Sequence, residues 1–240
     1  MHKFLLAGAL FAAAVPATAF AHESLAPANW SGTGELGLAL SKGNTDSQTL
    51  IGKLGVAKEE ALWKHEAGLA FLYGKQNGLE SAYRYEGFGK TNHQISERSY
   101  MSGSARIERD HHAAYEYQST AAAGYGYKAI ATEASHLNFE IGSGYRWAKQ
   151  QGIRVHEDGA VLRGHMDFNH QFNASTSLYD TLLVEAGRDN TFARNELGLK
   201  VKMSDALALK AGVEVRHNTD VLPDTRKTDT LTTVNIAYGF

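Results

Sequence analysis

The last eleven residues, 230–240, alternate apolar side chains with polar or small ones and end on an aromatic residue. Soluble domains usually fray at their ends. The closing strand of a bacterial outer-membrane β-barrel instead presents an apolar face to lipid and pairs with the first strand. The pattern therefore predicts a barrel that closes here, and this strand is also where barrel-assembly machinery is expected to bind. The apolar face that closes the barrel consists of Val234, Ile236, Tyr238 and Phe240.

The beginning of the chain has the three parts of a secretory signal peptide. A short positive segment precedes an apolar run at 4–15, and Ala19 and Ala21 fit the A-x-A cleavage rule. The apolar run is too short to cross a bilayer as a helix. A buried N-terminal helix is the alternative, but it does not explain the complete signal. We expect a cleaved signal peptide, 1–21, and an outer-membrane barrel, 22–240.

The composition agrees with an exported barrel and excludes several functions. The chain has no Cys, which excludes disulfides, thiolate metal sites and Cys nucleophiles. The net charge of −2 provides no field that would attract nucleic acid. After residue 21 no apolar run approaches the roughly 18 residues that a membrane helix needs. A mean hydropathy of −0.34 is compatible with barrel strands, because their lipid-facing and lumen-facing residues average out.

Period-two alternation predicts twelve antiparallel strands between about residue 30 and residue 240. An even number brings both chain ends to the periplasmic side. Short connections, such as 59–62 and 204–205, alternate with longer polar ones, such as 150–158 and 218–227. A soluble β-sandwich is the alternative, but it does not explain a charged face opposite an aliphatic face on nearly every strand. Aromatic residues near strand ends are expected to form interfacial girdles: Trp30, Trp63, Tyr73, Tyr115, Tyr127 and Trp147.

The predicted inward faces carry charges of both signs in near balance. Two interpretations remain open. The charges pair with each other and fill the barrel, or they line a narrow channel that selects solutes. A basic group on two neighbouring strands would favour anions, unless adjacent carboxylates neutralise it. The candidate selectivity residues are Arg194, Lys200, Lys202, Lys210 and Arg216, with Glu196 and Glu214. The other expected lumen charges are Glu35, Lys53, Arg84, Glu86, Arg106, Glu108, Glu116, Glu140, Arg146, Arg163, Asp167 and Glu185.

A second group of candidates lies near an expected outer rim, where cationic side chains can meet the phosphates of lipopolysaccharide. This group consists of Arg106, Arg109, His111 and His112. The two His residues follow Asp110, and an exposed polar loop explains them better than a surface metal site. No nucleophile elbow and no His-x-x-x-His pair is present. We therefore expect no enzyme activity, no catalytic residue, no metal site and no cofactor.

Several segments resemble the salt-induced outer-membrane proteins of the YdiY type, a barrel family that is a domain of unknown function. These segments are WSGTGELGLALSKGNTDSQTL from Trp30, ARIERD at 105–110, AGYGY at 123–127 and the end DTLTTVNIAYGF. The resemblance covers essentially the whole chain after the signal peptide. It implies an outer-membrane barrel of a Gram-negative bacterium and induction by salt. It supplies no catalytic residue and no transported substrate.

Together these observations favour a monomeric 12-stranded transmembrane barrel that lets small or ionic solutes pass passively under osmotic or salt stress. The alternative is a filled structural barrel whose outer loops bind lipopolysaccharide or an external partner, without transport. The outer-membrane lipid itself is an expected partner in both cases.

Overall fold

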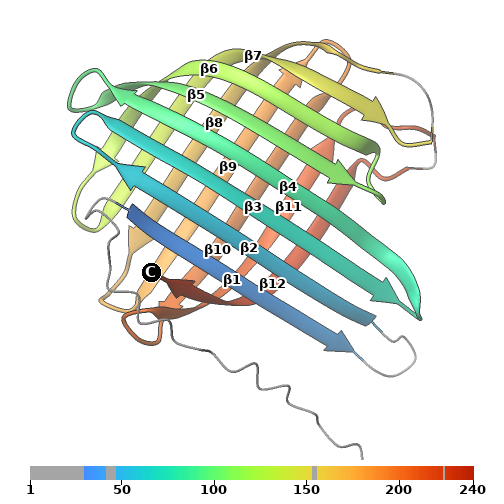
Figure 1. Cartoon of the computed structure of the whole chain (residues 1–240), viewed down its shortest axis with the longest axis horizontal. Helices are drawn as coiled ribbons and strands as arrows, with labels where there is room; N and C mark the ends of the chain where they lie inside the picture. The colour runs from blue at the N-terminus through green and yellow to red at the C-terminus, as the bar shows by residue number, and fades with distance from the viewer. Residues whose placement is uncertain (1–29, 42–46, 153–155, 224) are drawn as a thin grey trace, which may run out of the picture.

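The computed structural model describes residues 30–41, 47–152, 156–223 and 225–240, and they form one closed antiparallel barrel (Figure 1). The predicted signal peptide, including Ala19 and Ala21, lies outside the described residues. No helix in the described part of the chain is long and apolar enough to cross a membrane. The strands are β1 (Trp30–Ser41), β2 (Ser47–Glu59), β3 (Trp63–Gln76), β4 (Leu79–Gln94), β5 (Ser99–Asp110), β6 (Tyr115–Ala131), β7 (Ser135–Gln150), β8 (Gly159–Gln171), β9 (Thr176–Gly187), β10 (Thr191–Lys202), β11 (Leu207–Asn218) and β12 (Thr228–Gly239).

The last strand closes the barrel as the sequence predicts. β12 pairs with β1 in an antiparallel register that places Glu35 opposite Ala237. Beyond the strand, the Phe240 N–H donates to the Gly32 carbonyl at 3.0 Å, and the Gly32 N–H donates to the Phe240 carbonyl at 2.7 Å. The Phe240 ring lies against Gly32, where an added Cβ would be 2.2 Å from a ring carbon. A side chain at position 32 would therefore require the Phe240 ring to move.

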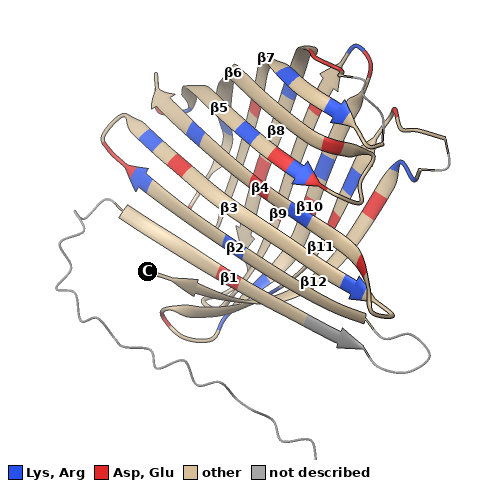
Figure 2. Cartoon of the chain, turned by 45° about the vertical axis from the view of Figure 1, so that its right-hand side comes forward, with Lys and Arg blue, Asp and Glu red and all other residues tan. Residues whose placement is uncertain are grey.

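The strand pleat separates an apolar outer surface from a polar interior. On β12, Val234 and Ile236 are 57% and 53% exposed, whereas the intervening Asn235 is 3% exposed. Leu69 and Ile107 are likewise exposed on the outside. Lys, Arg, Asp and Glu occur on every wall of the barrel (Figure 2). An apolar exterior around a charged interior is the reverse of a soluble protein and matches a barrel that faces lipid.

The two ends of the barrel differ. The terminal end carries Trp30, Phe240 and short connections such as 60–62 and 203–206. The loop end, where β7 ends on the right of Figure 1, has the two longest intervals between consecutive strands, 151–158 and 219–227. This difference was predicted, and it corresponds to the short periplasmic turns and longer external loops of outer-membrane barrels.

One part of the predicted aromatic girdle is wrong. Trp30, Trp63 and Trp147 are exposed on the outer surface as expected, but Tyr115 is 2% exposed. The pairing of β6 with β7 is irregular between Tyr115 and Tyr117. Such a β-bulge inserts one residue and reverses the alternation of faces. It turns Tyr115 into the barrel and brings Glu116, which was predicted to face inward, to the external cations described below.

Candidate functional site

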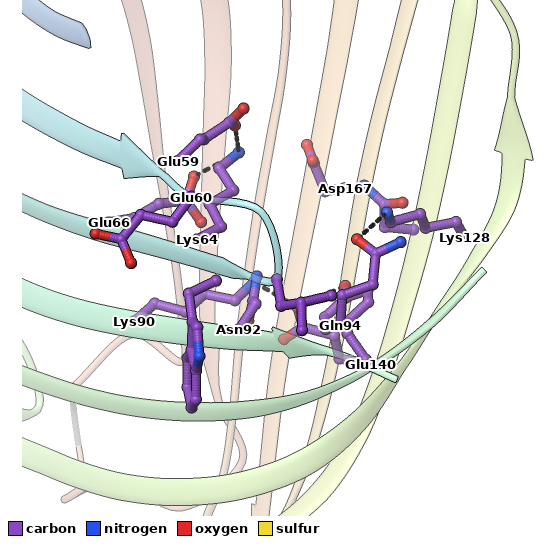
Figure 3. A pocket seen from close by; sticks show the side chains of 14 residues that line it. Glu59, Glu60, Lys64, Glu66, Lys90, Asn92, Gln94, Lys128, Glu140 and Asp167 are labelled. Atoms are coloured by element: carbon purple, nitrogen blue, oxygen red, sulfur yellow. Dashed lines mark hydrogen bonds and ion pairs between the residues drawn. The ribbon is translucent and has the colours of Figure 1, made fainter. Parts of the chain in front are cut away.

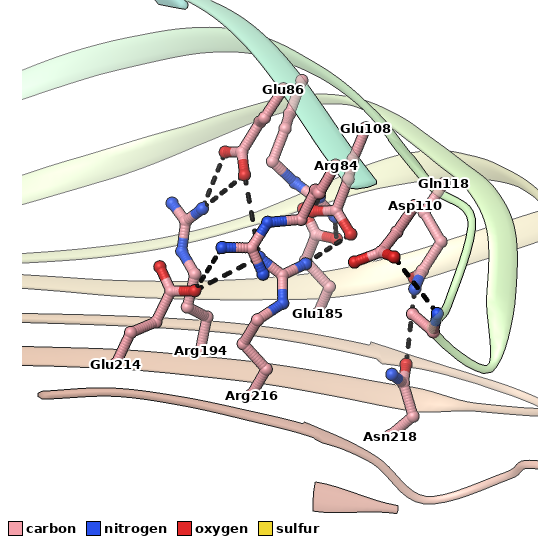
Figure 4. A network of polar contacts seen from close by, with 12 residues as sticks. Arg84, Glu86, Glu108, Asp110, Gln118, Glu185, Arg194, Glu214, Arg216 and Asn218 are labelled. Carbon is pink, nitrogen blue, oxygen red and sulfur yellow. Dashed lines mark hydrogen bonds and ion pairs between the residues drawn. The ribbon is translucent and has the colours of Figure 1, made fainter. Parts of the chain in front are cut away.

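Ion pairs cross the interior of the barrel and connect β4 and β5 with β9, β10 and β11 (Figure 4). Arg84 donates to Glu214 at 2.7 Å. Arg194 donates to both oxygens of Glu86 at 2.7 Å. These pairs join opposite walls because the pleat points the charged residues of both walls into the lumen. These interior charges are therefore paired across the barrel, as the filled-barrel interpretation predicts.

Arg216 on β11 is at the centre of this network. It forms an ion pair with Glu108, and its guanidinium also lies 3.8 Å from Glu86 and 3.8 Å from Glu214. The side chain is 7% exposed. A cation this buried needs its carboxylate partners, because removing one member of a buried pair leaves an uncompensated charge.

A second buried arginine extends the network toward β9. Arg106 contacts Glu108 at 2.9 Å and Glu185 at 2.8 Å. Phe192 is fully buried, and the guanidinium carbon atoms of Arg106 and Arg216 lie 4.8 Å and 5.2 Å from its ring centre. The ring therefore makes a favourable contact with both guanidinium groups.

Hydrogen-bonded side chains fill the interior next to this network at the loop end. Asn190 donates to Asn218 at 2.8 Å, and Gln118 donates to the same oxygen at 3.4 Å. Tyr115 donates to Glu157 at 2.7 Å. Sequence reasoning did not single out Asn190 or Asn218. Residues in loops and at strand ends have no fixed face, so alternation gives no signal for them.

The opposite part of the lumen is open. A cavity of about 250 Å³ lies between β1–β4 and β10–β12. Short side chains line it on one side, including Thr33, Ala70 and Thr233. Lys53 crosses the cavity to Glu196 at 3.0 Å. Between the loop end and the Arg216 network, the lumen is thus filled beside β5–β9, and it is narrow but not filled beside β1–β3 and β12.

The predicted basic group does not form a free positive stripe. Arg194 and Arg216 are paired within the network described above, and Lys210 contacts Glu35 at 2.5 Å. Glu196 and Glu214 hold Lys53 and Arg84 and are therefore part of the neutralised lumen.

The two remaining lysines of that group are exposed where β10 ends, at the terminal end. Lys202 lies 3.0 Å from Asp205 in the following turn, and no ion pair of Lys200 is found in the described parts of the chain. Lys200 and Lys202 share the face of Glu196, as the alternation along β10 predicts. They lie at the end of the strand, however, and therefore at the mouth of the barrel and outside the central lumen.

The predicted outer-rim group is corrected at one position. Arg106 is a buried lumen residue and does not reach the rim, because it shares the inward face of β5 with Glu108. Arg109 does lie on the outer wall, is 48% exposed and contacts Glu116 at 2.8 Å. Lys149 contacts the same carboxylate at 2.5 Å. This outer cluster carries two cations for one anion.

The two histidines of the rim group lie in the loop that follows β5. The carboxylate of Asp110 accepts the backbone N–H of His112 at 2.9 Å, and the His112 ring lies 3.0 Å from Glu80. His111 packs edge-on against Tyr83 at 4.7 Å. Among the described residues no group of three His, Asp or Glu side chains is placed to hold a metal ion.

A second cavity of about 280 Å³ opens at the terminal end (Figure 3). Its wall includes the turn after β2, where Lys58 contacts Glu60 at 2.6 Å. This hydrogen bond and the charge of Lys58 hold the pKa of Glu60 below its usual value. Glu140 lies deeper in the same cavity, where it is paired with Lys90 and accepts a hydrogen bond from Tyr100 at 2.9 Å.

Comparisons with known proteins agree with this architecture. The translocator domain of the autotransporter NalP from Neisseria meningitidis is 14% identical, covers 90% of each chain and superposes with a TM-score of 0.51. The KdgM porin (12% identity, 88% of this chain and 99% of that one) and the NanC porin (9%, 88% and 97%) each give a TM-score of 0.46. At 14% identity, the likeness to the translocator domain shows the barrel fold alone. No curated protein matches the chain.

A family model assigns the chain to a protein family, whereas the solved structures show only its fold. The model described as a protein of unknown function, DUF481, matches residues 34–240, which include the strands that build the network and both cavities. The expectation that the chain belongs to a family of unknown function is confirmed. From this match, the chain belongs to the DUF481 family.

Proposed function

We propose that this protein is a monomeric outer-membrane barrel of a Gram-negative bacterium that lets small or ionic solutes pass through a narrow part of its lumen. The terminal end would face the periplasm and the loop end the outside. The observation that carries the proposal is the unequal filling of the lumen. Short side chains such as Thr33 and Ala70 border a cavity, whereas buried Arg, Tyr and Phe side chains fill the other side.

The paired charges indicate what such a path would select. Each cation that borders the cavity is held by a carboxylate, as in Lys53–Glu196 and Arg84–Glu214. A balanced lining gives only a weak preference for cations or anions, so size would decide which solutes pass. Induction under salt or osmotic stress, which the resemblance to YdiY-type proteins implies, is part of this proposal. We propose no enzymatic activity.

Filling the open side of the lumen is expected to block passage. Ala70→Trp adds an indole to the cavity wall, and we expect solute release from liposomes to fall severalfold. Ala67→Trp is the matched control, because Ala67 is exposed on the outer face of the same strand. Equal release from both variants, with both barrels folded, would refute a path beside β3.

A second candidate function is lipopolysaccharide binding at the loop end. The outer cluster of Arg109, Lys149 and Glu116 favours it, because an exposed excess of cations at an outer rim suits lipid phosphates. We expect Arg109→Ala with Lys149→Ala to weaken lipopolysaccharide binding about tenfold, the loss expected for one charge-assisted contact.

The controls for this second function separate its residues from the rest of the barrel. Arg98→Ala removes an exposed cation from a turn at the terminal end and is expected to leave lipopolysaccharide binding unchanged. His112→Ala tests the contribution of the loop after β5. If neither the double variant nor His112→Ala lowers binding, the rim has no such role.

A further inference from the structure

The cavity at the terminal end contains two opposite charges that form no ion pair with any residue the structure describes. Lys128 on β6 donates a hydrogen bond to the Gln94 side chain at 3.0 Å. Asp167 on β8 faces the same cavity (Figure 3). In the parts of the chain that the structure describes, neither residue forms an ion pair, and Asp167 also accepts no hydrogen bond. A charge held at a cavity wall without a partner is a group available to a ligand.

The other charged groups of this cavity are already paired. Glu140 is held by Lys90 and by Arg163, the latter at 3.2 Å. Lys64 lies 3.3 Å from Glu59 and 3.2 Å from Glu66. These pairs leave Lys128 and Asp167 as the two charges that a bound molecule can complement without displacing a protein partner.

The strand register fixes how these two charges are arranged. Lys128 lies opposite Asn138, and Asn138 lies opposite Asp167, so the three residues form one row across β6, β7 and β8. Directly opposed residues are about 5 Å apart between Cα atoms, which separates the ends of the row by roughly 10 Å. This is consistent with the absence of a direct ion pair between Lys128 and Asp167, and all three residues line the cavity.

The chemistry of the row suits a molecule that carries charges of both signs. A carboxylate would accept hydrogen bonds from the Lys128 ammonium, and the Asn138 amide can donate or accept beside it. An organic ammonium would donate to Asp167. The Tyr100 side chain also lines the cavity.

We propose that the terminal mouth binds small organic zwitterions, with the ammonium at Asp167 and the carboxylate at Lys128. This inference rests on the proposed function in one respect only, because a solute that binds at this mouth is a candidate for passage. Binding itself requires no open lumen, so the two ideas can fail separately.

The test is equilibrium binding of 4-aminobutyrate to the full-length barrel in detergent, followed by nuclear magnetic resonance or calorimetry. Butylammonium and butyrate are the comparison ligands, since each carries only one of the two charges. We expect the zwitterion to bind more tightly than either analogue. Asp167→Asn and Lys128→Gln are each expected to weaken its binding about tenfold, the loss of one charge-assisted contact.

Matched variants and a ligand comparison keep the test specific. Asp205→Asn and Lys202→Gln make the same chemical changes at the terminal end but outside this cavity, and should leave binding unchanged. Asp167→Asn should weaken butylammonium and spare butyrate, and Lys128→Gln should do the reverse. No measurable binding of the zwitterion, or equal losses in the outside variants, overturns the inference. Binding with no release of the solute from liposomes overturns only its passage.

Discussion

Arg216→Ala is expected to destabilise the barrel by about 3–5 kcal/mol, the cost of breaking a buried ion pair from one side. Arg216 lies within 3.8 Å of three carboxylates, those of Glu108, Glu86 and Glu214. Its removal leaves Glu108 with Arg106 alone and weakens the compensation of the other two. The measurement is the urea dependence of Trp fluorescence in detergent micelles, with heat-modifiable gel mobility as a second readout.

Two further variants determine whether this loss comes from charge. Lys202→Ala removes an exposed cation whose one ion pair among the described residues is with Asp205, and it should change stability by about 0–1 kcal/mol. Without Arg216, the network has one carboxylate in excess. Combining Arg216→Ala with Glu108→Gln removes that excess negative charge and should restore part of the lost stability. A single variant as stable as the wild type would show that the network does not hold the walls together.

Removing the Glu86–Arg194 bridge is expected to widen the lumen. The double variant Glu86→Ala with Arg194→Ala keeps the net charge and deletes a contact that joins β4 to β10. Both side chains border the open cavity, so their removal enlarges it. We expect single-channel conductance in a planar bilayer to rise severalfold.

The control for this experiment is a second charge-neutral pair of deletions, Lys202→Ala with Asp205→Ala, at the exposed terminal end. It should leave conductance unchanged, because neither side chain lies in the central lumen. If removal of the Glu86–Arg194 bridge has no larger effect than removal of this exposed pair, the bridge does not limit the passage of ions.

Alternation along the strands was sufficient to predict the barrel and most of its faces. In β11, Leu209 and Val213 face outward and Glu214 and Arg216 inward, as expected from the period of two. The same rule gave the closing face of β12. These predictions succeed because a barrel in lipid must keep its two faces chemically distinct along every strand.

The sequence could not show which charges meet inside. Arg84 and Glu214 are 130 positions apart, and their contact depends on strand tilt and on the distance between opposite walls. The error at Tyr115 has a similar origin, since a single bulge reverses the faces of a strand end. Lys128 is different, because alternation from the outward-facing Tyr127 places it inside the barrel, yet it was not among the expected lumen charges.

The central claim is that a narrow path with a balanced lining remains beside β1–β3. It is tested most directly by the conductance of the purified, refolded protein in a planar bilayer under a salt gradient. We predict small discrete steps with a reversal potential close to zero, because the lumen cations are paired with carboxylates. A folded barrel that inserts and stays silent would contradict the path and favour a filled structural barrel.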